Sequence, residues 1–81
     1  MNPRDFENLV SADLIDEIEL FRPVSINGEI LGDWQVDIRI KTRRIQLQTA
    51  RGGLKTFSNL DTALNFVRNR GWKLSVILNG G

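Results

Sequence analysis

Lysine, arginine and glutamine side chains between positions 39 and 55 are the residues of this 81-residue chain with the clearest chemistry. Lysine and arginine neutralise phosphates, and arginine and glutamine can read guanine and adenine edges, so the set suits a nucleic acid. The competing interpretation is a solvated sheet face whose charges keep other strands from pairing with it. The candidate residues for binding a nucleic acid or another partner are Arg39, Lys41, Arg43, Arg44, Gln46, Gln48, Arg51 and Lys55.

Four carboxylates closer to the N-terminus form a second set. Asp13 and Glu17 are four residues apart and Asp16 and Glu19 are three apart, so each of these pairs shares a face if this stretch is helical. Catalytic carboxylates need a pocket that shifts their pKa, and the sequence gives no sign of one. We expect either an ordinary polar helix face or an alternative surface that docks on a basic protein partner, such as a second copy in a homodimer. The residues of this set are Asp13, Asp16, Glu17 and Glu19.

The charge of the chain is divided along its length, although the net charge is only +1. Residues 1–33 contain two basic and eight acidic side chains, whereas residues 34–81 contain nine basic and two acidic ones. Such an asymmetry predicts two surfaces of opposite sign in one small molecule.

Composition and length exclude several classes of function. The absence of cysteine excludes a thiol nucleophile, a disulfide framework and a Cys-ligated zinc site, and the absence of histidine removes the commonest general base. A chain of this length folds as one domain with a thin core, which leaves little room for a deep cavity. No apolar run approaches 18 residues, and no signal peptide is recognisable. We expect a cytoplasmic protein that is not an enzyme, with no catalytic residue, metal, cofactor, small-molecule substrate or membrane contact.

An acidic amphipathic helix is predicted over residues 1–22. Pro3 suits a first helical turn, and apolar residues recur every three or four positions from Phe6 to Phe21. Pro23 ends the run, because the residue before a proline is pushed out of the helical region. Ser11 allows an alternative, in which a break near residues 10–12 divides the helix.

Residues 34–57 are predicted to form a basic β-meander. A short hairpin around Asn27-Gly28 precedes it, and alternation from Trp34 to Ile40 gives the first strand one apolar face. A turn about Thr42-Arg43 would pair Ile40 with Ile45, Ile38 with Leu47 and Val36 with Thr49. A third strand over 54–57 needs a bulge or an early end, because a flat strand cannot point both of its apolar ends inward.

A helix and a final strand are predicted over residues 59–78. Ser58 and Asp61 have capping-box spacing, Gly71 suits the helix end, and residues 73–78 alternate again. The order α-(β)-β-β-β-α-β predicts a single α+β domain over residues 1–81. We expect a two-layer sandwich in which two helices cover one face of an antiparallel sheet of three to four strands. The basic sheet face would then lie open, opposite the acidic helix.

The stretch 47–72 contains a Thr-x-Arg-Gly turn at 49–52 and a Lys-Thr-Phe strand at 55–57. Leu-Asp-Thr-Ala at 60–63 then opens a helix that stops at Gly71. This pattern resembles small plasmid-borne bacterial accessory proteins, both partition-associated and transfer-associated. The resemblance implies a non-enzymatic role in the maintenance or transfer of a mobile element. It assigns no partner and no functional residue.

Overall fold

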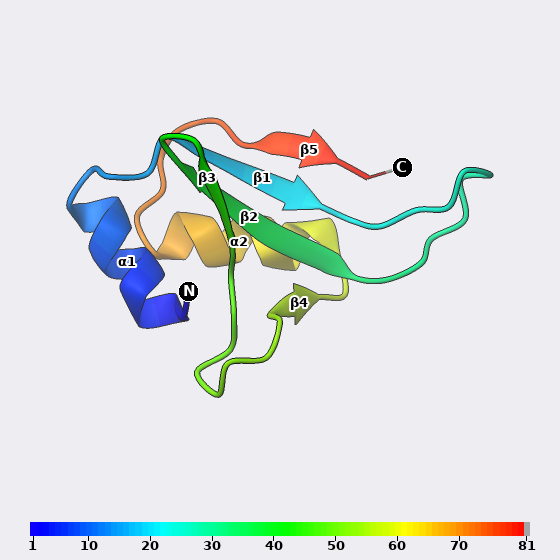
Figure 1. Cartoon of the computed structure of the whole chain (residues 1–81), viewed down its shortest axis with the longest axis horizontal. Helices are drawn as coiled ribbons and strands as arrows, with labels where there is room; N and C mark the ends of the chain where they lie inside the picture. The colour runs from blue at the N-terminus through cyan, green and yellow to red at the C-terminus, as the bar shows by residue number, and fades with distance from the viewer. Residues whose placement is uncertain (81) are drawn as a thin grey trace.

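A computed structural model describes residues 1–80 of the chain, and its fold is α+β. Two helices accompany a mixed sheet of five strands (Figure 1). In chain order the elements are α1 (Pro3–Ser11), β1 (Glu17–Phe21), β2 (Trp34–Ile40), β3 (Arg43–Gln46), β4 (Thr56–Phe57), α2 (Leu60–Asn69) and β5 (Ile77–Asn79).

The predicted helix over residues 1–22 is wrong beyond Ser11, although the alternative break near residues 10–12 is where the helix ends. Asn2 caps α1 by accepting a hydrogen bond from the Asp5 backbone nitrogen at 2.8 Å. The chain then turns through Asp13, whose φ of 58° is left-handed. Residues 17–21 form a strand, β1, because two neighbouring strands are available to pair with them. Buried and half-buried side chains alternate along this strand.

The strand order is β3-β2-β1-β5, with β4 pairing further along β2 on the side of β3. β1 runs antiparallel to β2, but β5 joins the other edge of β1 in parallel. The sheet is therefore mixed, and the expectation of a purely antiparallel sheet is wrong. A parallel neighbour needs a long crossover connection, which the α2 segment supplies.

The β2–β3 hairpin differs from the predicted register by two residues. Ile38 lies opposite Ile45, and Ile40 lies opposite Arg43, so that Lys41 and Thr42 form the turn. A shift of two preserves the face on which each side chain lies, because the period of a strand is two. Asp16 holds this turn: its carboxylate accepts from the Lys41 backbone nitrogen, and its own nitrogen donates to the Arg39 carbonyl at 2.9 Å.

The hydrophobic core lies between the sheet and the helices. α2 packs against β1, β2 and β4, behind the sheet in the view of Figure 1. α1 contributes one fully buried side chain, Phe6, whose ring stacks on Phe66 of α2 with centroids 6.1 Å apart. The fully buried large side chains are Phe6, Ile18, Leu20, Val36, Ile38, Leu47 and Val67.

Two hairpins project from the body of the fold (Figure 1). The one predicted at Asn27-Gly28 is present, with Val24 bridging to Ile30. The other spans residues 47–55 between β3 and β4, and Gln48 bridges to Leu54 across it. Its turn contains Gly52 at a φ of +92°, a conformation that side-chain-bearing residues rarely adopt.

The third predicted strand and the second helix start differently from expectation. Leu54 is exposed and Phe57 is buried, so the two do not share a face, and regular pairing with β2 begins only at Thr56. Asn59, not Ser58, caps α2 by accepting from the Thr62 nitrogen at 2.8 Å. The strand predicted over residues 73–78 is limited to β5, at residues 77–79.

Candidate functional site

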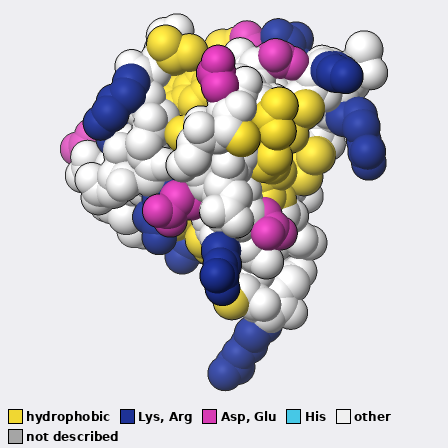
Figure 2. Space-filling model, turned by 90° about the vertical axis from the view of Figure 1, so that its left-hand side faces the viewer, with side chains coloured by type: hydrophobic (Ala, Val, Ile, Leu, Met, Phe, Trp, Pro, Cys, Tyr) yellow, Lys and Arg dark blue, Asp and Glu magenta, His cyan; other side chains and the backbone are white. Residues whose placement is uncertain are grey.

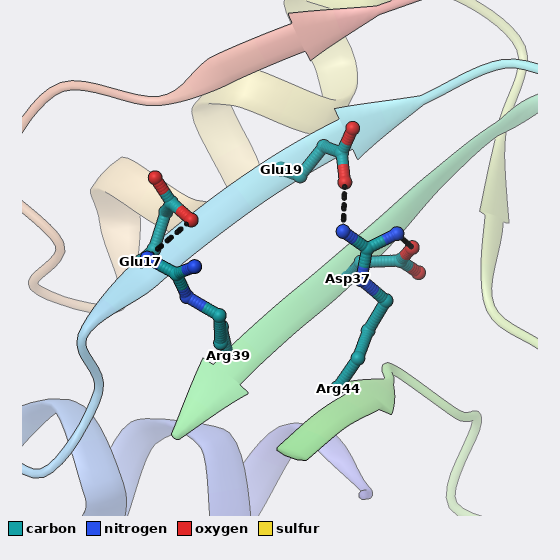
Figure 3. Close-up of a pocket in the computed structure, with 5 residues that line it drawn as sticks. All are labelled: Glu17, Glu19, Asp37, Arg39 and Arg44. Atoms are coloured by element: carbon teal, nitrogen blue, oxygen red, sulfur yellow. Dashed lines mark ion pairs between the residues drawn. The ribbon is translucent and has the colours of Figure 1, made fainter. Parts of the chain in front are cut away.

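The open face of the sheet carries a cluster of five charged side chains from three neighbouring strands (Figure 3). An Arg39 nitrogen lies 2.8 Å from a Glu17 carboxylate oxygen. Arg44 reaches two carboxylates, Glu19 at 3.2 Å and Asp37 at 3.8 Å. Three carboxylates thus surround two guanidinium groups, and the face that was predicted to be basic is neutralised by the chain itself.

The strand register explains this cluster. Glu17 lies opposite Arg39 across β1 and β2, and Glu19 lies opposite Asp37. Arg44 lies opposite Arg39 on the other side of β2, so its guanidinium can extend over the sheet toward both carboxylates. The cavity among these side chains holds only about 10 Å³, room for one water molecule and not for a substrate.

Asp37 is the most perturbed group of the cluster. The residue is 7% exposed, and its Oδ1 atom has no hydrogen-bond partner within residues 1–80. Burial raises the pKa of the Asp37 carboxyl, the charge of Arg44 lowers it, and the nearby Glu19 raises it further, with burial the largest effect. The folded protein therefore holds this proton to a higher pH than the unfolded chain.

Asp37→Asn should become more stable relative to wild type as the pH rises. Between the ordinary pKa of 3.8 and the raised value, the folded state binds more protons, so the free energy of unfolding of wild type falls with rising pH. The asparagine variant lacks this decline. Urea unfolding of both proteins from about pH 3 to about pH 7 measures the difference. Asp33→Asn, at an exposed position, is the matched control. A difference that stays constant with pH would show that the contact with Arg44 balances burial, and a difference of opposite sign would show that it outweighs burial.

The four residues of the alternative acidic set do not share a helix face, because α1 ends at Ser11 and Glu17 and Glu19 lie on β1. Asp13 lies in the turn after α1, Asp16 holds the β2–β3 turn, and Glu17 and Glu19 point from β1 toward arginines. Figure 2 shows Lys and Arg mixed with Asp and Glu over the α1 end of the molecule, with hydrophobic side chains between them. The expectation of an acidic helix facing away from a basic sheet is therefore wrong.

The other predicted cations occupy the outer edge of the sheet instead. Both β3 and β4 pair with β2, so residues 41–57 run along one rim, with the 47–55 hairpin projecting between them. Within residues 1–80, four cations on this rim have no ion pair. We call them the outer cationic edge: Lys41, Arg43, Arg51 and Lys55.

Of the two candidate glutamines, only Gln48 uses its side chain for hydrogen bonds within residues 1–80. The Met1 nitrogen donates to the Gln46 carbonyl at 3.2 Å and to the Gln48 side-chain oxygen at 2.9 Å. The Gln48 amide also donates to the Gly52 carbonyl at 3.1 Å, which stabilises the 47–55 hairpin. Gln48 is therefore occupied within the fold, while the Gln46 side chain remains exposed.

A groove between β4 and α2 contains residues that were not predicted as a site. Its volume is about 540 Å³, and its lining includes Lys55, Phe66 and Arg70 but no carboxylate. The Arg70 guanidinium lies 3.7 Å from the centroid of the Phe66 ring. The spacing of four between these two residues on a predicted helix was an available signal. No signal in the sequence indicates that Lys55 lies near Phe66, because that contact depends on the tertiary fold.

The described part of the chain offers no geometry for a metal or a membrane span. Among residues 1–80, no three His, Cys, Asp or Glu side chains are grouped so that they could hold a metal ion. Neither helix in that range is long and apolar enough to cross a bilayer. In comparisons with known proteins, no family model, curated protein or solved structure matches the chain, so the functional argument depends on its own surfaces.

Proposed function

We propose that this protein binds nucleic acid without catalysis, through the outer cationic edge. One observation carries the proposal: residues 41–57 contain five basic side chains and no acidic one, in a chain with ten carboxylates overall. Of the five, only Arg44 takes part in an ion pair within residues 1–80. Positive charge that the fold leaves uncompensated is suited to a polyanion.

The arrangement of the edge supports contact with a phosphate backbone. β3, the 47–55 hairpin and β4 follow one another along the rim, so the cations are spread over a line rather than gathered at one point (Figure 1). Arg51 lies at the tip of the hairpin, and cations project at the lower end of Figure 2, where that hairpin lies. Four phosphate contacts would give a slope of about −3 to −4 for the logarithm of affinity against that of salt concentration.

The experiment is fluorescence anisotropy with a labelled oligonucleotide over a range of salt concentrations. At about 50 mM salt, R43Q/R51Q should bind at least about tenfold more weakly than wild type, with a salt slope lower by about two. The double variant R4Q/K73Q removes the same charge from exposed positions outside the edge, and it should change both quantities little. Absence of binding by wild type, or an equal loss in the control, would refute the proposal.

The biological setting is part of the same proposal. The stretch that resembles plasmid-borne accessory proteins, residues 47–72, corresponds to the projecting hairpin, β4 and α2. These elements carry Arg51 and Lys55 of the outer cationic edge. We propose a cytoplasmic accessory role in the maintenance or transfer of a mobile element, in which the protein contacts the nucleic acid of that element.

A further inference from the structure

The groove between β4 and α2 has an unusual chemical composition for this protein. Its lining consists of two cations, two phenylalanines and five hydroxyl or amide side chains, without a carboxylate. A volume of about 540 Å³ lies within the range of ligand sites. The hydroxyl and amide side chains are Thr56, Ser58, Thr62, Asn65 and Asn69.

A flat platform lies within this groove. The Phe66 ring packs against the rings of Phe57 and Phe6, with centroids 5.2 and 6.1 Å away. The Arg70 guanidinium lies over the same ring at 3.7 Å and is also within 3.5 Å of the Phe66 carbonyl oxygen. The aromatic contacts of Phe66 and the hydrogen bond from Arg70 to the Phe66 carbonyl fix the orientation of the pair, so little conformational entropy is lost when a ligand binds.

Positive charge is concentrated beside the platform. The Lys55 ammonium lies 5.8 Å from the Phe66 centroid and 5.3 Å from that of Phe57. Lys55 and Arg70 therefore lie near one ring, with no carboxylate in the lining to compensate them. An anionic group bound there would gain from both cations and would face no carboxylate in the lining.

We propose that this groove binds an unpaired nucleotide of a single-stranded nucleic acid, an inference that rests on the proposed function. Lys55 and the edge of the Arg70 guanidinium would contact the phosphate, and the base would stack on the outer face of that guanidinium, which Phe66 supports from the other side. The amides and hydroxyls would bind the sugar and the base edge. An acidic peptide would use the two cations but neither the platform nor the amides, so a nucleotide fits the whole lining better.

The position of Lys55 favours a polymer over a free nucleotide. Lys55 belongs both to the groove and to the outer cationic edge, so a strand seated in the groove continues toward Arg51. In a duplex the two faces of each base are covered by the neighbouring bases, so no base is free to stack on the platform. The groove therefore gives a preference for single strands over a duplex of the same sequence.

The test compares a labelled single-stranded oligonucleotide with its duplex by anisotropy, using wild type, R70K and F66L. R70K keeps the charge but loses the planar group, and F66L keeps apolar bulk but loses the ring. We expect each variant to bind the single strand about tenfold more weakly and the duplex less than about twofold more weakly. R4K, at an exposed position of α1, is the matched control and should match wild type. Circular dichroism shows whether F66L remains folded, and the R70K result stands if it does not.

The outcomes separate this inference from the proposed function. If R70K binds single strands as wild type does while R43Q/R51Q binds them more weakly, the groove is not the nucleotide site. The proposed binding by the outer cationic edge would then still stand. Absence of all binding by wild type would overturn both. If adenosine monophosphate binds as tightly as the oligonucleotide and R43Q/R51Q has no effect on that binding, the ligand of the groove is a free nucleotide. The inference of a single strand would then be refuted. A weaker mononucleotide together with a selective loss in R70K supports the inference.

Discussion

Replacing Glu17 and Glu19 together by glutamine should strengthen nucleic-acid binding by about tenfold to a hundredfold at about 50 mM salt. In wild type their carboxylates lie 2.8 Å from Arg39 and 3.2 Å from Arg44, the two arginines of the open sheet face. Without them, Arg39 has no ion pair within residues 1–80, and Arg44 keeps only its longer contact with Asp37 at 3.8 Å. About one to two further phosphate contacts then become possible, and the salt slope should steepen by about one to two. The open face would then become the basic surface that the sequence pattern suggested.

The variant should remain folded, because glutamine keeps the size and a hydrogen-bonding oxygen of each glutamate. The side chains of Arg39 and Glu17 are 51% and 32% exposed, so loss of that pair costs about 0–1 kcal/mol of stability. The Glu19 side chain is only 13% exposed and also accepts from Asn79, so its replacement costs more. E7Q/E29Q removes the same charge from exposed positions on α1 and on the first hairpin. An equal gain in this control would indicate a general effect of net charge. No gain in E17Q/E19Q would show that the ion pairs do not restrain the arginines.

Phe6→Ala should lower the free energy of unfolding by about 3–5 kcal/mol. Phe6 is fully buried, is the one buried residue of α1, and packs on the Phe66 ring. A domain of this length has a total stability of about 4–12 kcal/mol, so the variant would lose a large share of it.

Urea unfolding followed by circular dichroism measures this effect. Glu7→Ala changes the neighbouring exposed position of the same helix and should stay within about 0.5 kcal/mol of wild type. A loss below about 1 kcal/mol in Phe6→Ala would mean that α1 does not pack on α2 in solution. Because Phe6 also supports the groove platform, a folded Phe6→Ala protein should bind single strands more weakly than wild type.

Elements that depend on local chemistry were predictable from the sequence. The residue types of β2 alternate between apolar and polar, the first hairpin has Asn27-Gly28 at its turn, and α2 ends before Gly71. Residues 14–21 were not predictable in this way, because their apolar positions fit a helical and an extended period equally well. Pairing with β2 and β5 decides between the two, and that pairing is non-local.

The same non-local pairing decides the charge of the candidate surfaces. The pattern of β2 and β3 shows that Arg39 and Arg44 lie on the open face, but only the position of β1 shows that carboxylates lie beside them. The groove was missed for a similar reason, since Lys55 and Phe66 lie on separate elements and meet through packing of β4 on α2. The sequence therefore identified the residue types that carry charge, but only the fold shows which side chains lie beside them.

The parallel pairing of β1 with β5 has a consequence for biosynthesis. Glu19 lies opposite Ile77, so one edge of β1 stays unpaired until residues 77–79 leave the ribosome. Pairing of β1 with β5 closes a long loop, which costs conformational entropy before the stabilising contacts form. This pairing is therefore slower than formation of the local β2–β3 hairpin. The nascent chain thus exposes a strand with free backbone hydrogen-bonding groups, and premature association of two such chains is the hazard that this topology creates.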